Sequence, residues 1–340
     1  MVRRLTLAFL LVLVAGACLA KEKDKKKDPG EIGNRDVGKG VNFYSIEKEM
    51  ALGRQLAIEV EKQAKMVDDP IVGEYVNRVG QNLARNSDAK MPIAFKIIDS
   101  DSVNAFTLPG GHVFVNSGLI RVAETEAELA GAVAHEIAHV AARHLTRQMT
   151  RAEITNLASI PLVFWGGWWG YAARQGAGLG IPLTFLSFSR AFEGEADLLG
   201  LEYMYKAGYD PTASIDIFER IESLEKRKPG SIAKVFSTHP MTADRIRMAQ
   251  KNINEILPNK PEYVVNTSEF NEMRGRMIAA HQRQKRQAED PAKPTLRQAP
   301  SGGKRSTGSQ TTAMAGPPSS ATSRTPTCKY NRIQRNPLKR

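Results

Sequence analysis

In the first part of the chain, apolar and polar residues follow two patterns, one typical of helices and one typical of strands. Residues 44–67 and 70–87 place apolar side chains at helical spacing, which predicts two amphipathic helices. Two β-rich runs follow at 93–106 and 111–120. Between them the segment Thr-Leu-Pro-Gly-Gly indicates a turn, so a small sheet is expected after the two helices.

A longer apolar pattern at 125–149 predicts one long helix. Thr125, followed three residues later by Glu128, is the sequence signature of a capping box at its N-terminus. Small apolar residues fill the next turns around a few polar side chains. A further helical pattern begins near residue 189, and no internal repeat is present.

The N-terminus has the layout of a secretory signal peptide. Two arginines precede an apolar run from Leu5 to Ala20, whose 16 residues fall short of the about 20 that span a membrane. We therefore expect a signal peptide at 1–20 and a charged linker at 21–40. Cleavage after Ala20 and lipidation of Cys18 both remain open.

The C-terminal residues 281–340 are rich in Pro, Ser, Thr, Gly and basic side chains. Such a segment buries too little apolar surface to offset its ordering entropy, so we expect a disordered basic tail. The folded body is then residues 41–280. Cys328 lies in this tail, which argues against an internal disulfide framework.

The net charge of +12 is concentrated at the two ends. Lys and Arg outnumber Asp and Glu by seven to three in residues 1–30 and by thirteen to two in 281–340, whereas the remainder carries 28 against 31. A nearly neutral body behind an export signal excludes a nucleic-acid partner.

The helix at 125–149 carries a candidate metal-binding motif. His135 and His139 lie four residues apart, so their imidazoles differ by about 40° around the axis and share one face. Two nitrogen ligands in this arrangement suit zinc, and Glu136 can reach a metal-bound water. The alternative is a structural histidine pair in a buried helix.

A second motif supplies a third ligand. Glu193 and Asp197 lie at i and i+4 of the later helical pattern, so Glu193 can bind the metal while Asp197 hydrogen-bonds the outer nitrogen of a ligating histidine. A solvated acidic face is the alternative, which the first motif disfavours. One Zn²⁺ per chain is therefore the predicted cofactor.

The other histidines carry weaker signals. On a continuing helix His144 points about 140° away from His139, so it is expected to pack or to face solvent. His112 follows the turn and is expected to be exposed, and His281 carries no signal. His239 precedes a proline in a loop, and spacing alone leaves its role open.

Four motifs together resemble a known family. They are HEIAH at 135–139, SRAFEGEAD at 189–197, NAFTLPGGHVFVNSGL at 104–119 and STHPMTADRI at 237–246. Their order and spacing resemble the gluzincin metallopeptidases of the CaaX-prenyl-protease type, above all the soluble periplasmic branch that includes a protease of outer-membrane assembly. The resemblance covers residues 43–255. It implies an α+β zincin-like fold, mainly helical, with a small sheet whose edge strand faces the active-site cleft.

The resemblance also implies roles for individual residues. It makes residues 41–280 a zinc metallopeptidase domain in which His135, His139 and Glu193 bind zinc and Glu136 is the general base. A histidine matching His239 approaches the metal from its loop, as a fourth ligand that plugs the site or as a group that steadies the oxyanion.

Two further matches concern the surroundings of the metal. In the family an arginine matching Arg245 lies near the metal, and we count Arg245 with Glu136 and His239 as candidate catalytic residues. Asn104, Ala105 and Phe106 match the edge strand that pairs with an extended substrate.

Residues 157–186 form an apolar segment with three tryptophans. Pro161 and several glycines interrupt it, so a mobile lid or an interfacial hairpin fits better than a membrane span. Tryptophan favours interfaces, and contact with a membrane surface through this segment is therefore one expectation.

These observations predict an exported zinc metalloendopeptidase in the periplasm of a Gram-negative-type bacterium, either free or held as a lipoprotein through Cys18. Its expected substrates are misfolded or unassembled envelope polypeptides. The alternative is a self-plugged, chaperone-like protein that binds client chains and keeps a largely structural zinc. The periplasmic assembly protease carries a helical-repeat domain where this chain has a polar tail. The way in which that protease is targeted is therefore not inferred for this chain.

Overall fold

The computed structural model describes a folded body and leaves several segments outside it. The described residues are 28–159, 188–227, 239 and 242–289. The predicted signal peptide with Cys18, the apolar segment beyond residue 159 and the tail from residue 290 lie outside the described residues. Predictions about those segments stay predictions.

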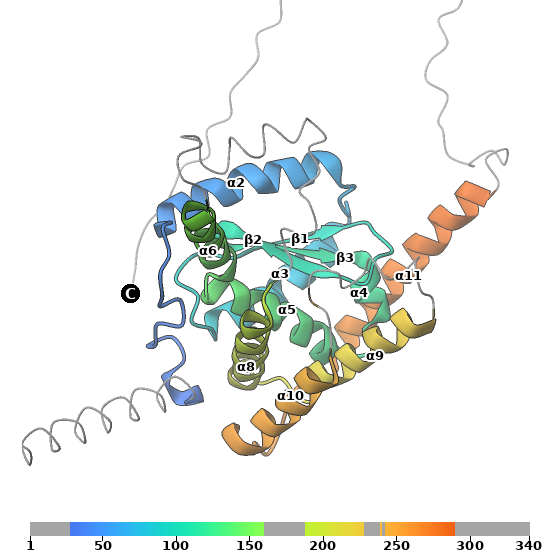
Figure 1. Cartoon of the computed structure of the whole chain (residues 1–340). Helices are drawn as coiled ribbons and strands as arrows, with labels where there is room; N and C mark the ends of the chain where they lie inside the picture. The colour runs from blue at the N-terminus through green and yellow to red at the C-terminus, as the bar shows by residue number, and fades with distance from the viewer. Residues whose placement is uncertain (1–27, 160–187, 228–238, 240–241, 290–340) are drawn as a thin grey trace, which may run out of the picture. The chain divides into compact units, whose positions relative to one another are not determined.

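A three-stranded sheet occupies the centre of this body (Figure 1). Strand β3 (His112–Asn116) lies between β1 (Ala94–Ile98), to which it is parallel, and β2 (Ala105–Leu108), to which it is antiparallel. The short helix η2 (Pro109–Gly111) joins β2 to β3 at the expected turn. Gly110 and Gly111 adopt φ values of 74° and 85° there, a backbone conformation that glycine tolerates without strain.

The strand predicted at 111–120 ends earlier than expected. Residues from Ser117 onward form helix α4 (Ser117–Val122). The helix starts against the backbone of Asp101 and Ser102, where a Cβ on Gly118 would lie 2.5 Å from the Ser102 carbonyl oxygen. Glycine at this position allows the chain to turn out of the sheet.

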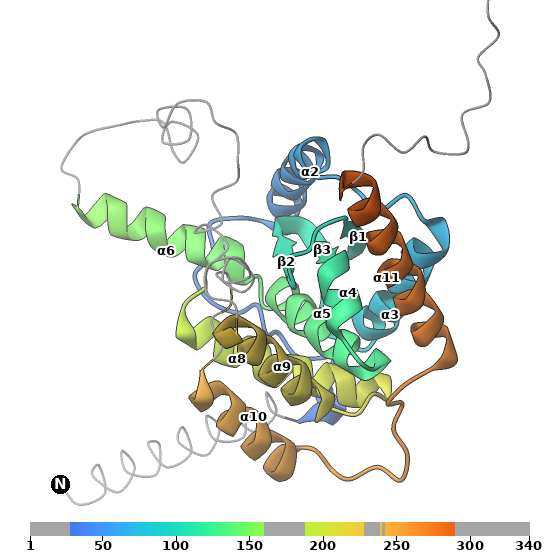
Figure 2. The ribbon, with the colours of Figure 1, turned by 90° about the vertical axis from the view of Figure 1, so that its right-hand side faces the viewer.

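Helices cover both faces of the sheet (Figures 1 and 2). One face carries α2 (Ile46–Gln63), and the other carries α3 (Pro70–Arg85) and α5 (Glu126–Ala141). Side chains of β3 alternate accordingly. Phe114 joins the apolar cluster on the α2 side, whereas Val113 and Val115 join the larger core with α3 and α5.

Four of the described helices that follow α5 come from the C-terminal half of the chain. Helices α8 (Arg190–Ala207) and α9 (Ala213–Arg227) pack on α5 away from the sheet, and α10 (Ala243–Ile256) packs on both (Figure 2). Helix α11 (Ser268–Glu289) packs on α3 and α4 and runs nine residues past the boundary expected at 280. The predicted α+β, mainly helical zincin-like class is confirmed. Within the described ranges, none of the helices has the length and apolarity that crossing a membrane requires.

Helix α5 is buried along its whole length. Its N-terminus is capped as expected, because the Thr125 hydroxyl accepts the Glu128 N–H. The Glu128 carboxylate accepts the N–H of Glu124, one residue before the position that a capping box uses. Small residues allow α8 to come close. A Cβ on Gly200 would lie 3.2 Å from the backbone nitrogen of His135.

The long helix predicted at 125–149 is broken after Ala141. Arg143 has a φ of 53°, and α6 (His144–Ser159) then begins in a new direction. Tertiary contacts hold this turn, because the Arg143 guanidinium donates to Glu49 Oε2 at 2.7 Å and to the Tyr44 carbonyl at 2.6 Å. The prediction of one continuous helix was therefore wrong.

Residues 28–45, expected in part as a charged linker, belong to the folded body and begin with η1 (Pro29–Glu31). The Arg35 side chain is buried and contacts Asp88 Oδ2 at 2.9 Å and Glu202 Oε2 at 2.5 Å. Farther along, the Phe43 N–H donates to the Thr150 hydroxyl on α6. These contacts tie the segment to α6 and α8.

Candidate metal centre

Three segments of the chain bring together four side chains that could hold a metal ion. His135 and His139 come from α5, Glu193 from the first turn of α8, and His239 from the residues before α10. One donor atom from each lies within 4.8 Å of every other, and all four residues are buried. Helical spacing predicted the histidine pair and Glu193, the family resemblance implied His239, and the fold brings all four side chains close together.

The donor set fits one zinc ion. Tetrahedral bonds of about 2.0–2.2 Å place neighbouring donors about 3.3 Å apart. The His135 and His139 Nε2 atoms are 3.1 Å apart, and they lie 3.5 and 3.7 Å from the two Glu193 oxygens. His239 Nδ1 lies 2.8 Å from Glu193 Oε1 and 3.4 Å from His135 Nε2. The four donors thus surround a common point.

Electrostatics favour the forms of these side chains that bind metal. Burial lowers the pKa of His139 well below its usual value, with help from the charges of His135 and His239, so His139 is held as the neutral imidazole that ligates zinc. Burial raises the pKa of Glu193, but the charge of His239 and hydrogen bonds from His135 and His239 outweigh it. The pKa of this carboxyl is held well below its usual range.

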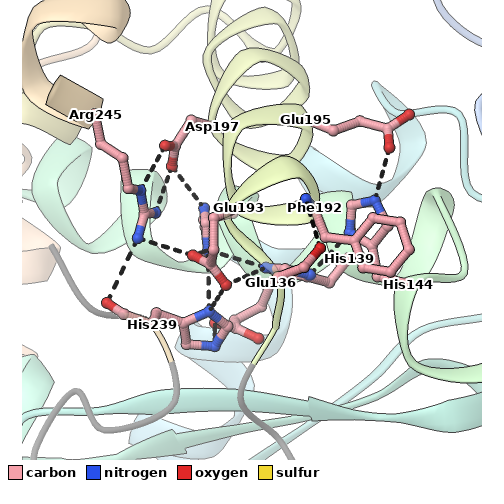
Figure 3. A network of polar contacts seen from close by, with 11 residues as sticks. Glu136, His139, His144, Phe192, Glu193, Glu195, Asp197, His239 and Arg245 are labelled. Atoms are coloured by element: carbon pink, nitrogen blue, oxygen red, sulfur yellow. Dashed lines mark hydrogen bonds and ion pairs between the residues drawn. The ribbon is translucent and has the colours of Figure 1, made fainter. Parts of the chain in front are cut away.

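Glu136 points into the same space from the helix turn beside His135 (Figure 3). Its Oε1 lies 3.3 Å from His239 Nε2, while its buried Oε2 accepts no hydrogen bond from any described residue. Burial raises the pKa of this carboxyl. A carboxylate beside the metal donors with a raised pKa and an unused oxygen can accept a proton from a water there.

Asp197 and Arg245 contact the candidate metal donors His135 and Glu193. Asp197 Oδ1 lies 3.1 Å from His135 Nδ1, as the i, i+4 spacing from Glu193 predicted. Arg245 donates to both Asp197 oxygens at 2.7 Å, and its Nη1 lies 2.8 Å from Glu193 Oε2. Arg245 therefore contacts the carboxylates of both Asp197 and Glu193.

His144 lies much closer to the site than the sequence predicted. Because the helix breaks at Arg143, the ring does not point away from His139. It is buried with Nδ1 2.9 Å from His139 Nδ1, and its Nε2 lies 3.0 Å from Glu195 Oε2. Among the described residues, the four-residue group that could hold a metal ion does not include His144. Neither its contact with His139 nor the role of Glu195 carried a signal in the sequence.

The two other histidines lie away from the metal centre. His112, expected to be exposed, is partly buried at the start of β3. His281 Nδ1 contacts Asp101 Oδ1 at 3.0 Å. Neither contributes to the candidate site.

The strand expected to bind substrate is an edge of the described sheet. Ala105 and Phe106 lie in β2, which pairs only with β3 among the described strands, and Asn104 immediately precedes it. The Asn104 carbonyl accepts the Asn116 N–H, so it is used inside the sheet. Helix α5, which carries the metal motif, packs against this strand.

The comparison with family models decides the family. A model described as peptidase family M48 matches residues 70–253, more than half of the chain. The chain belongs to peptidase family M48. The matched range contains all four metal donors. Membership in family M48 confirms the predicted resemblance, and with the donor geometry it identifies zinc as the metal of the group.

Several characterised proteins are similar to this M48 chain. A beta-barrel assembly-enhancing protease of Yersinia pestis is 30% identical over 66% of this chain and 48% of its own length. The mitochondrial metalloendopeptidase OMA1 of Schizosaccharomyces pombe is 36% identical over 54% of this chain and 52% of its own. The metalloprotease LoiP of Escherichia coli K12 is 30% identical over 54% and 73%. The chain spans about half the length of the assembly-enhancing proteases it matches.

Proposed function

We propose that the chain is a zinc-dependent metalloendopeptidase that hydrolyses misfolded or unassembled proteins of the bacterial cell envelope. The observation that carries the proposal is the buried carboxylate of Glu136, which has an unused oxygen beside the donors His135, His139 and Glu193. The names of the similar proteins, which include two proteases and a metalloendopeptidase, support the same activity.

The chain's own residues divide the catalytic work. Zinc held by His135, His139 and Glu193 would supply Lewis acidity and lower the pKa of a water at the site. Glu136 takes the proton of the attacking water at its free oxygen and passes it to the leaving amine. Asp197 and Arg245 keep His135 and Glu193 oriented for ligation.

His239 occupies the space that the reaction needs. It lies between Glu193 and Glu136, at 2.8 Å from one carboxylate and 3.3 Å from the other. A water that attacks a peptide must lie between the metal donors and the base. We therefore propose that His239 closes the fourth metal position in this state and withdraws when substrate binds.

The substrate is proposed to bind as an added strand. Main-chain pairing along β2 near Asn104, Ala105 and Phe106 would align an extended peptide beside α5. Such pairing reads little of the substrate's sequence and requires an unfolded segment. Misfolded proteins supply such segments, and the predicted signal peptide at 1–20 would place the enzyme among those of the envelope.

The first test replaces the base. Glu136→Gln in the full chain is expected to lower the rate of casein cleavage by at least about 100-fold, because proton transfer contributes that much or more. Zinc content, measured on the same samples, stays at one ion per chain, since the three proposed ligands are unchanged. Cleavage that persists in Glu136→Gln would contradict the assignment of the base.

The second test removes the proposed plug. His239→Ala is expected to increase casein cleavage several-fold and to leave one zinc ion bound by the other three donors. A loss of cleavage with zinc retained would show that His239 assists the reaction. If every variant binds zinc and unfolded casein without cutting it, the chain is a client-binding protein with a structural zinc.

A further inference from the structure

The two zinc-binding histidines of α5 differ in what holds their outer nitrogens. Nδ1 of His135 faces the carboxylate of Asp197 at 3.1 Å. Nδ1 of His139 faces the ring of His144 at 2.9 Å, and His144 in turn faces Glu195. Figure 3 shows these supports on opposite sides of Glu193, with Asp197 and Arg245 on one side and His144 and Glu195 on the other.

Proton positions in the second arrangement follow from a single requirement. His139 Nε2 points at His135 Nε2 across 3.1 Å, so its lone pair faces the metal position and its proton resides on Nδ1. That N–H donates to His144 Nδ1, which must then carry a lone pair. The proton of His144 is consequently on Nε2, from which it donates to Glu195 Oε2 at 3.0 Å. Once the proton of His139 is placed, each hydrogen bond fixes the position of the proton in the next one.

Packing holds the His144 ring in this orientation. Phe192 stacks on it with ring centroids 4.4 Å apart and an interplanar angle of 21°. The Arg147 guanidinium lies over the Phe192 ring, and its Nη1 lies 3.3 Å from Glu195 Oε2. His144 is fully buried, whereas the Glu195 side chain is 38% exposed, so the chain of contacts runs from the metal site towards the surface.

We propose that His144 and Glu195 are positioning residues that fix the tautomer and the ring orientation of the zinc ligand His139. This inference rests on the zinc site of the proposed function and extends it to two residues outside the donor group. His135 is supported directly by a carboxylate, and His139 is supported by a neutral imidazole with the carboxylate one step farther away. The zinc affinity therefore depends on a hydrogen-bond acceptor at residue 144.

The test compares two substitutions that separate hydrogen bonding from packing. His144→Asn can place its Oδ1 where the imidazole has Nδ1, so it keeps an acceptor for His139. His144→Leu fills similar space without an acceptor. The full chain of each variant is titrated with zinc against a chromophoric chelator, and the visible spectrum of the cobalt-substituted protein reports the geometry of the ligands.

Loss of the acceptor is expected to weaken zinc binding by about 10- to 100-fold, the usual effect of removing such a support. His144→Leu should also shift the cobalt bands, while His144→Asn keeps an affinity and a spectrum close to those of the wild type. Glu195→Leu should weaken binding less, because Glu195 contacts His139 only through His144. Glu195→Gln, which can still accept from His144, should leave the affinity unchanged.

Met277→Ala is the matched control. Met277 is buried on α11, which packs on α3 and α4, so its truncation lowers thermal stability without altering zinc affinity or the cobalt spectrum. The inference is overturned if His144→Leu binds zinc as tightly as the wild type, or if Asn and Leu weaken binding equally. A wild-type chain that binds no zinc would instead contradict the proposed function itself.

Discussion

At the metal centre, one guanidinium neutralises two carboxylates that would otherwise repel each other. Arg245 pairs with Asp197 and Glu193, and the side chains of all three are at least 89% buried. Hydrogen bonds to Asp197 and the charges of both carboxylates raise the pKa of Arg245 against the opposing effect of burial. The residue thus links the donor Glu193 to the support of His135.

Arg245→Leu is expected to lower the free energy of unfolding by about 3–5 kcal/mol in metal-free protein, because two buried carboxylates lose their partner. The loss should be smaller with zinc, whose charge compensates Glu193. Urea unfolding with zinc and with a chelator measures both values. Arg247→Leu is the control on the same helix, since its ion pair with Asp244 is exposed and should change stability by less than about 0.5 kcal/mol. Equal losses with and without zinc would contradict the coupling.

Single residues could be predicted from the sequence where the chemistry is local. The spacings of His135 with His139 and of Glu193 with Asp197 each lie within one helix, and helical geometry places them. His239 lies 104 residues after His135, so only the family resemblance indicated its position. His144 was misplaced because Arg143 adopts a positive φ without the glycine or asparagine that usually marks one.

Among the elements, close contacts between helices and loops rest on glycine. A Cβ on Gly53 in α2 would lie 1.8 Å from the carbonyl oxygen of Pro109, and only a glycine lets α2 rest on the turn before β3. Gly73 in α3 has open space where its Cβ would be. In two consecutive helices, the packing therefore requires glycine at Gly53 and leaves room for a side chain at Gly73.

Gly53→Ala and Gly73→Ala are expected to shift stability in opposite directions. Alanine favours the helix by about 0.8–1.0 kcal/mol at either position, but at Gly53 the clash with backbone must displace α2. We expect Gly73→Ala to raise the melting temperature and Gly53→Ala to lower it by several degrees. Thermal unfolding followed by circular dichroism is the measurement, and an increase for both variants would refute the packing argument.

The sequence predicted the helices and strands well where periodicity is strong. Helices α2 and α3 follow their apolar patterns, and the turn before β3 follows Pro109 and its glycines. The sequence failed to predict the early end of β3 and the break at Arg143. At both places, contacts with other segments of the chain determine the backbone conformation. Glu49 and Tyr44, which hold Arg143, precede it by 94 and 99 residues.

At the scale of the whole described body, a buried cluster of charged side chains anchors the N-terminal segment 28–45 to the rest of the fold. Arg35 contacts Asp88 after α3 and Glu202 in α8, and the side chains of all three are at most 4% exposed. Burial raises the pKa of Glu202 to about 7, although Arg35 pulls it down. A charge-rich stretch normally predicts a solvated linker, and nothing in the local pattern marks Arg35 as buried.

Arg35→Met should destabilise the protein in a pH-dependent way. Removing one partner of a buried pair costs about 3–5 kcal/mol. Without Arg35 the pKa of Glu202 rises further above its unfolded value, so the carboxyl's contribution to stability is retained at low pH and lost as pH rises through the folded pKa. Relative to the wild type, the variant should lose more stability at pH 8 than at pH 5. Urea unfolding at both values measures this, and the double change with Glu202→Gln should remove the difference.

The distribution of the donors along the chain sets the time at which activity can begin. The ribosome makes His135 and His139 early, but Glu193 follows them by more than 50 residues and His239 by 100 or more. Domains fold as the chain emerges, with N-terminal parts first. A growing chain therefore lacks the three proposed zinc ligands as a set until residue 193 has been made. More than half of the 340 residues must therefore be synthesised before a nascent copy can act as a zinc protease.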